Sequence, residues 1–195
     1  MKDFCICLVG LVEMVYGTTY AHQTWKRKIS PMLSTWLTFL IGTGLSLITY
    51  AIAQKHDFRS GILNVMDFLM VALVVVAILL WGKRGMRFKP FEKWYLGGIV
   101  GIVIYGIFSD DAFGSNIFTQ VLISLGYIPT IQNLIVEKRN TESFIGWGCG
   151  FIAGLIALYP ALIDGNALAL LYAIRTIVLV GVVLSVMAYY KFVKK

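Results

Sequence analysis

Residues 126–147 read GYIPTIQNLIVEKRNTESFIGW, and this stretch decides how the chain is organised. An apolar helix meets Pro129, continues to the charged EKRN and passes into a second apolar segment. A proline inside a helix removes one i→i−4 hydrogen bond and bends the helix. Within a membrane, such a bend is tolerated where neighbouring helices or cavity water satisfy the freed carbonyl. The stretch therefore predicts two membrane helices joined by a basic turn.

The composition is that of a membrane protein. Of the 195 residues, 58% are hydrophobic and 14% are charged, and the mean hydropathy is +0.79. A soluble domain is about half apolar and a quarter charged. A net charge of +7 is compatible with nucleic-acid binding. The cations lie between apolar blocks, however, so we expect no nucleic-acid partner. The three cysteines have no histidine at ligand spacing, and we expect neither a metal nor a cofactor.

Seven apolar segments are candidates to cross a bilayer, which takes about 20 residues of helix. Helices rather than strands are expected, because backbone groups in lipid must be satisfied within the segment. All the connections are short, which leaves no room for a separate soluble domain. The predicted spans are approximately 4–24, 32–53, 61–82, 94–109, 116–136, 143–162 and 166–190.

The distribution of lysine and arginine predicts the orientation. Thirteen of the 17 lie in connections on one side, three lie on the other, and Arg175 lies inside a predicted span. Because cytoplasmic connections carry an excess of Lys and Arg, we expect the N-terminus outside and the C-terminus in the cytoplasm. The expected location is a bacterial-type inner (plasma) membrane, with the lipid bilayer as a partner.

An internal repeat accounts for the odd number of spans. A shift of 108 residues lays the third span over the seventh, so that Asp67 matches Arg175. We therefore predict two triple-helix bundles, 1–90 and 113–195, joined by a linker helix at 91–112. The extra helix lets both bundles run parallel, a plan found in transporters. A shift of 111 residues supports the same repeat, because it pairs Tyr16 with Tyr127, Thr19 with Thr130 and Trp36 with Trp147. The alternative is that apolar helices resemble each other by chance.

The segment from Pro129 to Trp147 resembles a PQ-loop: a proline within a helix, a nearby glutamine, a basic turn, then a hydroxyl and glutamate cluster before the next helix. Over nearly its whole length the chain resembles the SWEET and PQ-loop superfamily, and PnuC-type carriers of nicotinamide riboside and thiamine resemble the same plan. The resemblance implies seven helices and transport by alternating access. Thr130 stands where the family has a glutamine after the proline, so the resemblance does not predict the substrate.

Candidate hinges lie at matching places in the two copies. Pro129 and Thr130 bend the fifth span, and Gly17 and Thr18 occupy the equivalent region of the first. A threonine can bond back to the backbone and bend a helix. We expect these positions to flex during transport; a static packing kink is the alternative.

Three residues with formally charged side chains lie within predicted spans: Glu13, Asp67 and Arg175. Each costs about 2.5–3.5 kcal/mol at the centre of a bilayer, so they are expected to face the interior. Asp67 and Arg175 are either an ion pair that locks the bundles together or the charged rim of a site for a polar or zwitterionic solute. Glu13 is a candidate proton carrier, because burial raises the pKa of a carboxylate.

The remaining candidates share helix faces with these charges. Residues three, four or seven apart lie on one face of a helix. Glu13 shares its face with Tyr16, Asn64 with Asp67, and Tyr172 with Arg175. By resemblance, Asn64 and Tyr172 lie where asparagines hold the sugar in SWEET proteins. Trp36 and Trp147 either stack on a substrate or anchor at the interface. The predicted substrate-binding residues are Asn64, Asp67, Tyr172, Arg175, Glu13, Tyr16, Ser124, Tyr127, Gln120, Trp36 and Trp147.

Three other functions compete with a carrier of a small polar solute (sugar, amino acid or vitamin-like). An enzyme is disfavoured, because no nucleophile with a base and no metal-binding motif is present. A retinal receptor requires a lysine inside the seventh span, which has Arg175 instead. A seven-helix receptor or binding protein of the same fold, without transport, stays as the alternative. The oligomeric state is not predicted.

Overall fold

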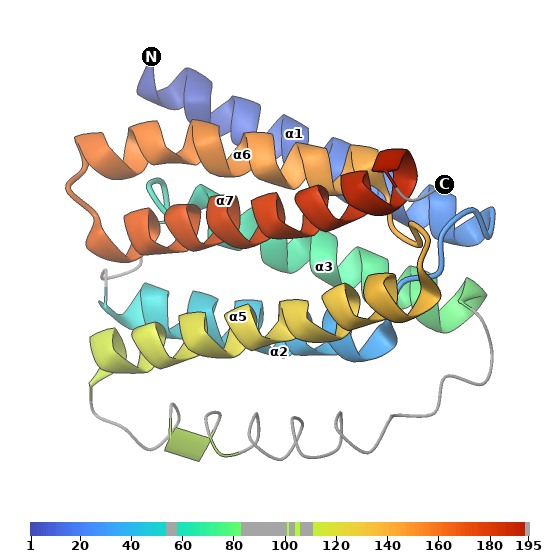
Figure 1. The fold of residues 1–195 in the computed structure, drawn as a ribbon. Coiled ribbons are helices and arrows are strands. Elements are labelled where there is room, and N and C mark those ends of the chain that lie inside the picture. Colours follow the sequence, from blue (N-terminus) through green and yellow to red (C-terminus); the bar gives the residue numbers. More distant parts are fainter. Residues whose placement is uncertain (54–57, 83–100, 102–103, 106–110, 194–195) are drawn as a thin grey trace.

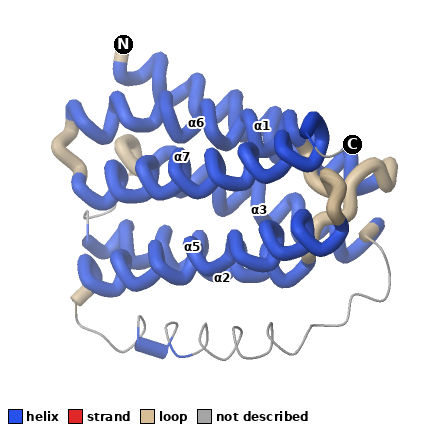
Figure 2. The backbone as a smooth tube through the Cα atoms, viewed as in Figure 1, coloured by secondary structure: helices blue, strands red, loops and turns tan. Residues whose placement is uncertain are grey.

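The computed structural model describes residues 1–53, 58–82, 101, 104–105 and 111–193. Within these residues the chain is helical and contains no strand (Figure 2). A short π-helical turn, η1 (Tyr189–Val193), follows the last long helix. The long helices are α1 (Lys2–Trp25), α2 (Leu33–Ala53), α3 (Ile62–Trp81), α5 (Ala112–Glu137), α6 (Phe144–Ile163) and α7 (Ala167–Ala188).

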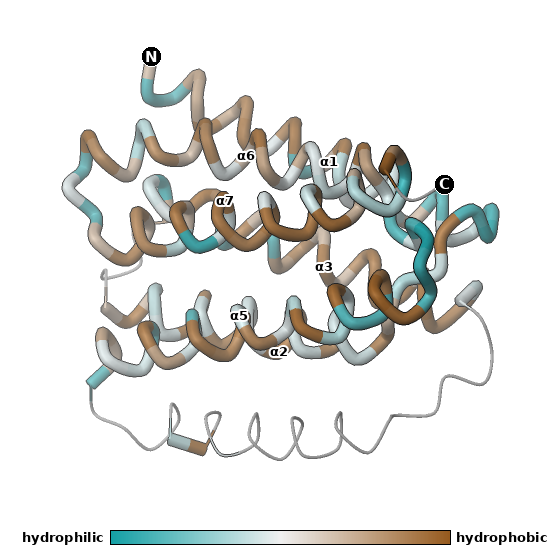
Figure 3. Tube along the Cα trace, in the orientation of Figure 1, coloured by the Kyte–Doolittle hydropathy of each residue, from teal (hydrophilic) through white to brown (hydrophobic). Residues whose placement is uncertain are grey.

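Six helices of the described part are long and apolar enough to cross a membrane. Apolar residues extend along each helix, and the most polar segments lie in the connections and at the N-terminus (Figure 3). The prediction of a helical, multi-pass membrane protein is thus confirmed. The predicted fourth span, 94–109, lies mostly outside the described residues. Seven helices, the three-part division of the chain and the orientation stay predictions.

Polar side chains define the starts of the last three long helices. Asp111, Ser143 and Asn166 precede α5, α6 and α7, and each side-chain oxygen accepts a hydrogen bond from the backbone N–H three residues later. Such caps satisfy an N–H group that has no partner within the helix. The predicted boundaries are therefore close to those observed.

Helices that are adjacent in sequence are not always adjacent in space. α1 packs against α3 and α6 rather than against α2, and α2 packs against α3 and α5. α7 packs against both α5 and α6. Each predicted half is therefore ordered with its third helix in the middle, and the halves meet where α1 lies on α6 and α2 lies on α5 (Figure 1).

The connections that follow α1 and α5 both carry lysine and arginine, and they meet at one end of the bundle, close to the C-terminus (Figure 1). Arg27 and Lys138, which are 111 residues apart, both adopt a left-handed backbone, with φ of 55° and 51°. The Ser30 N–H donates to the Thr141 carbonyl at 3.0 Å, which joins the two connections. We call this the basic end, formed by residues 26–31 and 138–143 and the adjoining turns of α1, α2 and α6.

Candidate functional site

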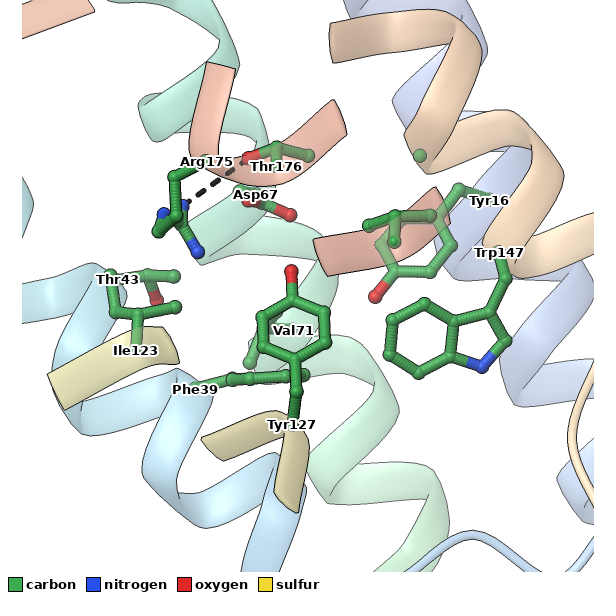
Figure 4. Close-up of a pocket in the computed structure, with 12 residues that line it drawn as sticks. Tyr16, Phe39, Thr43, Asp67, Val71, Ile123, Tyr127, Trp147, Arg175 and Thr176 are labelled. Atoms are coloured by element: carbon green, nitrogen blue, oxygen red, sulfur yellow. Dashed lines mark hydrogen bonds between the residues drawn. The ribbon is translucent and has the colours of Figure 1, made fainter. Parts of the chain in front are cut away.

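A central pocket lies where all six long helices converge (Figure 4). Its walls are mostly aromatic and aliphatic, with one carboxylate and one guanidinium among them. Such a combination of apolar walls and few polar groups is typical of small-molecule sites. The lining residues are Tyr16, Phe39, Thr43, Asp67, Val71, Ile123, Tyr127, Trp147, Gly150, Arg175, Thr176 and Val180.

Five of the predicted substrate-binding residues line this pocket: Tyr16, Asp67, Tyr127, Trp147 and Arg175. They come from five different helices, and all but the half-buried Asp67 are buried. In Figure 4 the Tyr127 hydroxyl points to the side of the pocket that holds the two charged groups. Tyr16 and Tyr127, and Asp67 and Arg175, which the sequence predicts to be matching positions, therefore line one cavity.

The charged groups of the pocket are held by Tyr172 rather than by each other. The Tyr172 hydroxyl donates to Asp67 Oδ2 at 2.8 Å, and the Arg175 guanidinium carbon lies 4.3 Å from the centre of the Tyr172 ring. Arg175 Nη2 donates to the Thr176 hydroxyl at 3.3 Å, whereas its Nε has no partner. No ion pair joins Asp67 to Arg175, so the direct pair considered from the sequence is absent. Both groups thus retain capacity to bind a ligand.

Glu13 lies next to this pocket but does not line it. Its side chain is 1% exposed and its Oε2 atom has no hydrogen-bond partner. It interacts electrostatically with Asp67. A carboxylate buried in this way is costly unless it is neutral or paired, so a proton-carrying role stays a prediction for Glu13.

An aromatic cluster closes the pocket toward the basic end. Trp36 is fully buried, and its ring lies 4.6 Å from Tyr20 and 6.2 Å from Trp147 between centroids. Phe39 and Tyr127 continue the cluster at 4.7 Å. The indoles of Trp36 and Trp147 are thus packed inside the bundle rather than exposed at its rim, and only Trp147 lines the pocket.

A network of amides and hydroxyls lies toward the opposite end. Ser46 Oγ accepts hydrogen bonds from the amides of Asn64 and Gln120, both at 3.0 Å. Asn116 donates to the Ser46 carbonyl at 2.9 Å and to the Thr49 hydroxyl at 3.0 Å. These bonds connect α2, α3 and α5. The predicted site residues Asn64 and Gln120 therefore belong to this network and not to the central pocket.

Sequence reasoning missed Ser46 and Asn116. Asn116 and Gln120 are four residues apart on one face of α5, and this spacing was the available signal. Ser124, also predicted for the site, donates to the Gln120 carbonyl at 2.7 Å and does not line the pocket.

A second, smaller pocket adjoins this network. Asn64, Asn116 and Tyr172 line it, and Tyr172 also bonds Asp67 of the central pocket. Asn166 closes it by donating to the Tyr50 hydroxyl at 2.8 Å and to the Ser60 hydroxyl at 2.9 Å. We call this region the amide end, formed by Ser46, Thr49, Tyr50, Ser60, Asn64, Asn116, Gln120 and Asn166.

The predicted hinge residues are all in helices, and their flexing stays a prediction. Gly17 packs so closely on α3 that an added Cβ would lie 2.5 Å from the sulfur of Met70. The Thr18 hydroxyl donates to the Met14 carbonyl at 2.5 Å. α5 continues through Pro129, and the Thr130 hydroxyl bonds that of Thr35 across to α2 at 3.0 Å.

One further buried carboxyl lies outside the helices, at the basic end. Glu142 is 3% exposed, and its Oε2 accepts hydrogen bonds from the Tyr20 hydroxyl and from the Trp147 indole at 3.2 Å. Burial raises the pKa of Glu142 to about 7, although the two donated hydrogen bonds partly oppose this rise. A glutamate in a basic connection carries no signal in the sequence that predicts its burial.

Within the described residues, no group of three or more His, Cys, Asp and Glu is placed to hold a metal ion. Comparison with models of known protein families finds no match to this chain, and a search of curated proteins finds none either. The function must therefore be inferred from the geometry of the chain itself.

Proposed function

We propose that this chain is a membrane transporter that moves a small polar solute by alternating access between two triple-helix bundles. The observation that carries the proposal is the central pocket, in which Asp67 and Arg175 face one cavity without forming an ion pair. A receptor or binding protein of the same fold is the second candidate, and the experiment below separates the two.

The packing of the helices supports a parallel repeat. Under the predicted shift, α1, α2 and α3 correspond to α5, α6 and α7, and the pair α1–α6 then corresponds to α5–α2. Both pairs pack closely, and each basic turn contains a residue with a left-handed backbone conformation at the matching position. Transporters with parallel repeats bind their solute between the repeats, near the middle of the membrane. The resemblance to the SWEET and PQ-loop superfamily rests on the segment from Pro129 to Trp147 and on the repeat predicted from the sequence.

The charges of the pocket favour a zwitterionic solute over a neutral sugar. A carboxylate of the solute would receive hydrogen bonds from the Arg175 guanidinium, whose Nε has no partner, and its ammonium group would lie near Asp67. A guanidinium recognises a carboxylate through charge-assisted hydrogen bonds, which are among the stronger ones in proteins. The aromatic side chains of Tyr16, Tyr127 and Trp147 would surround the remainder of the solute.

Counterflow in liposomes tests this function. Purified protein is reconstituted, the liposomes are loaded with an unlabelled solute, and uptake of the labelled solute is followed for neutral amino acids, glucose, nicotinamide riboside and thiamine. We expect an amino acid to accumulate on the order of 10-fold above protein-free liposomes. Asp67→Asn and Arg175→Gln should each lower this uptake by roughly 10-fold or more, the size typical of a lost charge-assisted contact.

The matched control is Arg139→Gln, which removes an exposed cation paired with Glu137 and leaves the pocket intact. Its uptake should equal that of the parent. Thermal stabilisation by a solute without counterflow of any of the four classes would contradict transport and favour the receptor. Unchanged uptake in both pocket variants would show that the solute binds elsewhere.

A further inference from the structure

Glu142 joins the two halves of the molecule at the basic end. One carboxyl oxygen, Oε2, receives both the Tyr20 hydroxyl of α1 and the Trp147 indole N–H of α6. The other oxygen, Oε1, is buried and has no hydrogen-bond partner. Trp147 also lines the central pocket, and Tyr20 packs on Trp36. The carboxyl therefore holds together the aromatic side chains that close this end.

The connection around Glu142 is itself fixed in place. The Asn140 side chain accepts a hydrogen bond from the Glu142 N–H at 3.1 Å and donates one to the Glu142 carbonyl at 3.0 Å. Thr141 is held by the Asn133 side chain and by the Ser30 N–H. The carboxyl can thus reach water only if water enters this end or the two connections separate.

No cation neutralises Glu142 in the described part of the chain. The titratable group that faces it is the Tyr20 phenol on α1; Trp147 on α6 does not titrate. The cations nearby in the fold are exposed and form no ion pair with it, and Lys191 of η1 lies over the ring of Phe144 instead. These cations are Lys26, Arg27, Lys28, Lys138, Arg139 and Lys191.

We propose that Glu142 is a proton-binding site whose occupancy controls the opening of the basic end. When the carboxyl is protonated it is neutral, and the contacts of Tyr20 and Trp147 with Oε2 keep the end closed. When the proton leaves to water, the negative charge extends to Oε1, which has no donor. A buried charge without a partner is costly, so water enters and the contact between α1 and α6 opens.

The direction of the pH dependence follows from the raised pKa of the Glu142 carboxyl. A hydrated glutamate in the open form has its ordinary pKa of 4.5, whereas the closed form holds the proton until about pH 7. The preference for the closed form is therefore complete below pH 4.5 and is lost as the pH rises through 7. The full change in the ratio of closed to open molecules is on the order of 300-fold.

Cysteine labelling tests this site directly. Cys5, Cys7 and Cys149 are replaced by alanine, and Ser143→Cys places a buried thiol beside Glu142. The rate of reaction with a water-soluble maleimide is measured in detergent micelles at pH 5 and pH 8.5. Because a thiol ionises over this range, each rate is divided by that of the same protein carrying Glu142→Gln. We expect this ratio to be near one at pH 5 and at least 10-fold higher at pH 8.5.

The matched control is Glu137→Gln, which removes an exposed carboxylate five residues away and should label like the parent at both pH values. A ratio that does not change with pH would overturn the proposal, as would rapid labelling of the Glu142→Gln protein at pH 5. If Ser143→Cys prevents folding, Thr24→Cys carries the same measurement from the last turn of α1, where Thr24 is 1% exposed.

The proposal rests on the proposed function only in that a solute would leave or enter through this end. Labelling requires no solute, so its result stands even if no counterflow is found. Conversely, intact counterflow together with labelling that is independent of pH would contradict the proposed role of Glu142 but not the proposed transport function.

Discussion

The two ends of the central pocket are closed by different chemistry. At the basic end, aromatic rings pack around one ionisable carboxyl, Glu142, which has a buried oxygen without a partner. At the amide end, neutral side chains such as Ser46, Asn116 and Asn166 make the closing hydrogen bonds. Both closures join segments from the two halves of the chain.

Because of this difference, the two ends can respond to different conditions. Neutral amides and hydroxyls do not titrate near neutral pH, whereas the Glu142 carboxyl does. A carrier that works by alternating access must open one end while the other stays closed. Closures of unlike chemistry are one way to make these two openings independent.

The largest effect is expected from the aromatic packing at the basic end. Trp36→Ala removes a fully buried indole and should lower the free energy of unfolding by about 3–5 kcal/mol. Thermal unfolding in detergent measures this loss. Trp25→Ala is the matched control, because its indole is half exposed, and it should have a much smaller effect. Equal losses in the two variants would show that the cluster does not hold this end.

The second largest effect is a dependence of the free energy of unfolding on pH, which we expect Glu142 to cause. Because its pKa is raised to about 7, its contribution to stability is present below pH 4.5 and is lost as the pH rises through 7. The parent should lose about 3 kcal/mol relative to Glu142→Gln between pH 4.5 and pH 8. Unfolding of both proteins across this range checks it. Parallel curves for the two proteins would mean that the carboxyl is hydrated.

A smaller loss is expected at the amide end. Ser46→Ala leaves the amide N–H groups of Asn64 and Gln120 without their shared acceptor and should cost about 1–3 kcal/mol. This loss should be the same at pH 5 and pH 8, in contrast to the effect of Glu142. Unfolding measured at the two pH values tests the contrast, and a loss that changes with pH would break it.

The smallest effect should come from Tyr50→Phe. The substitution removes one hydroxyl but leaves the hydrogen bond from Asn166 to Ser60, so we expect a loss of about 0.5–1.5 kcal/mol. Maleimide labelling of a cysteine at Ala169, which is buried and lines the second pocket, reports whether this end opens. Labelling should rise in Tyr50→Phe without a change at the basic end, and a rise at both ends would show that the closures are coupled.

Much of the architecture could be predicted from the sequence, because long apolar runs bounded by charged turns leave few alternatives in a membrane. The predicted span 32–53 differs by one residue from α2, and Asp67 and Arg175 line one pocket. The roles of Ser46, Asn116 and Glu142 could not be predicted. A serine in a helix can equally bond its own backbone, and a glutamate in a basic turn is ordinarily exposed.

The amino-acid sequence was sufficient to predict a bundle of apolar helices with Glu13, Asp67 and Arg175 turned away from lipid. This follows because lipid requires internal hydrogen bonding of the backbone and excludes unpaired charge. Which side chains contact each other is known only from the folded structure. The packing of α1 on α6 buries Glu142 and sets Tyr20 against it, and Tyr172 rather than Arg175 holds Asp67. These contacts depend on how the two halves fit together, which no single segment contains.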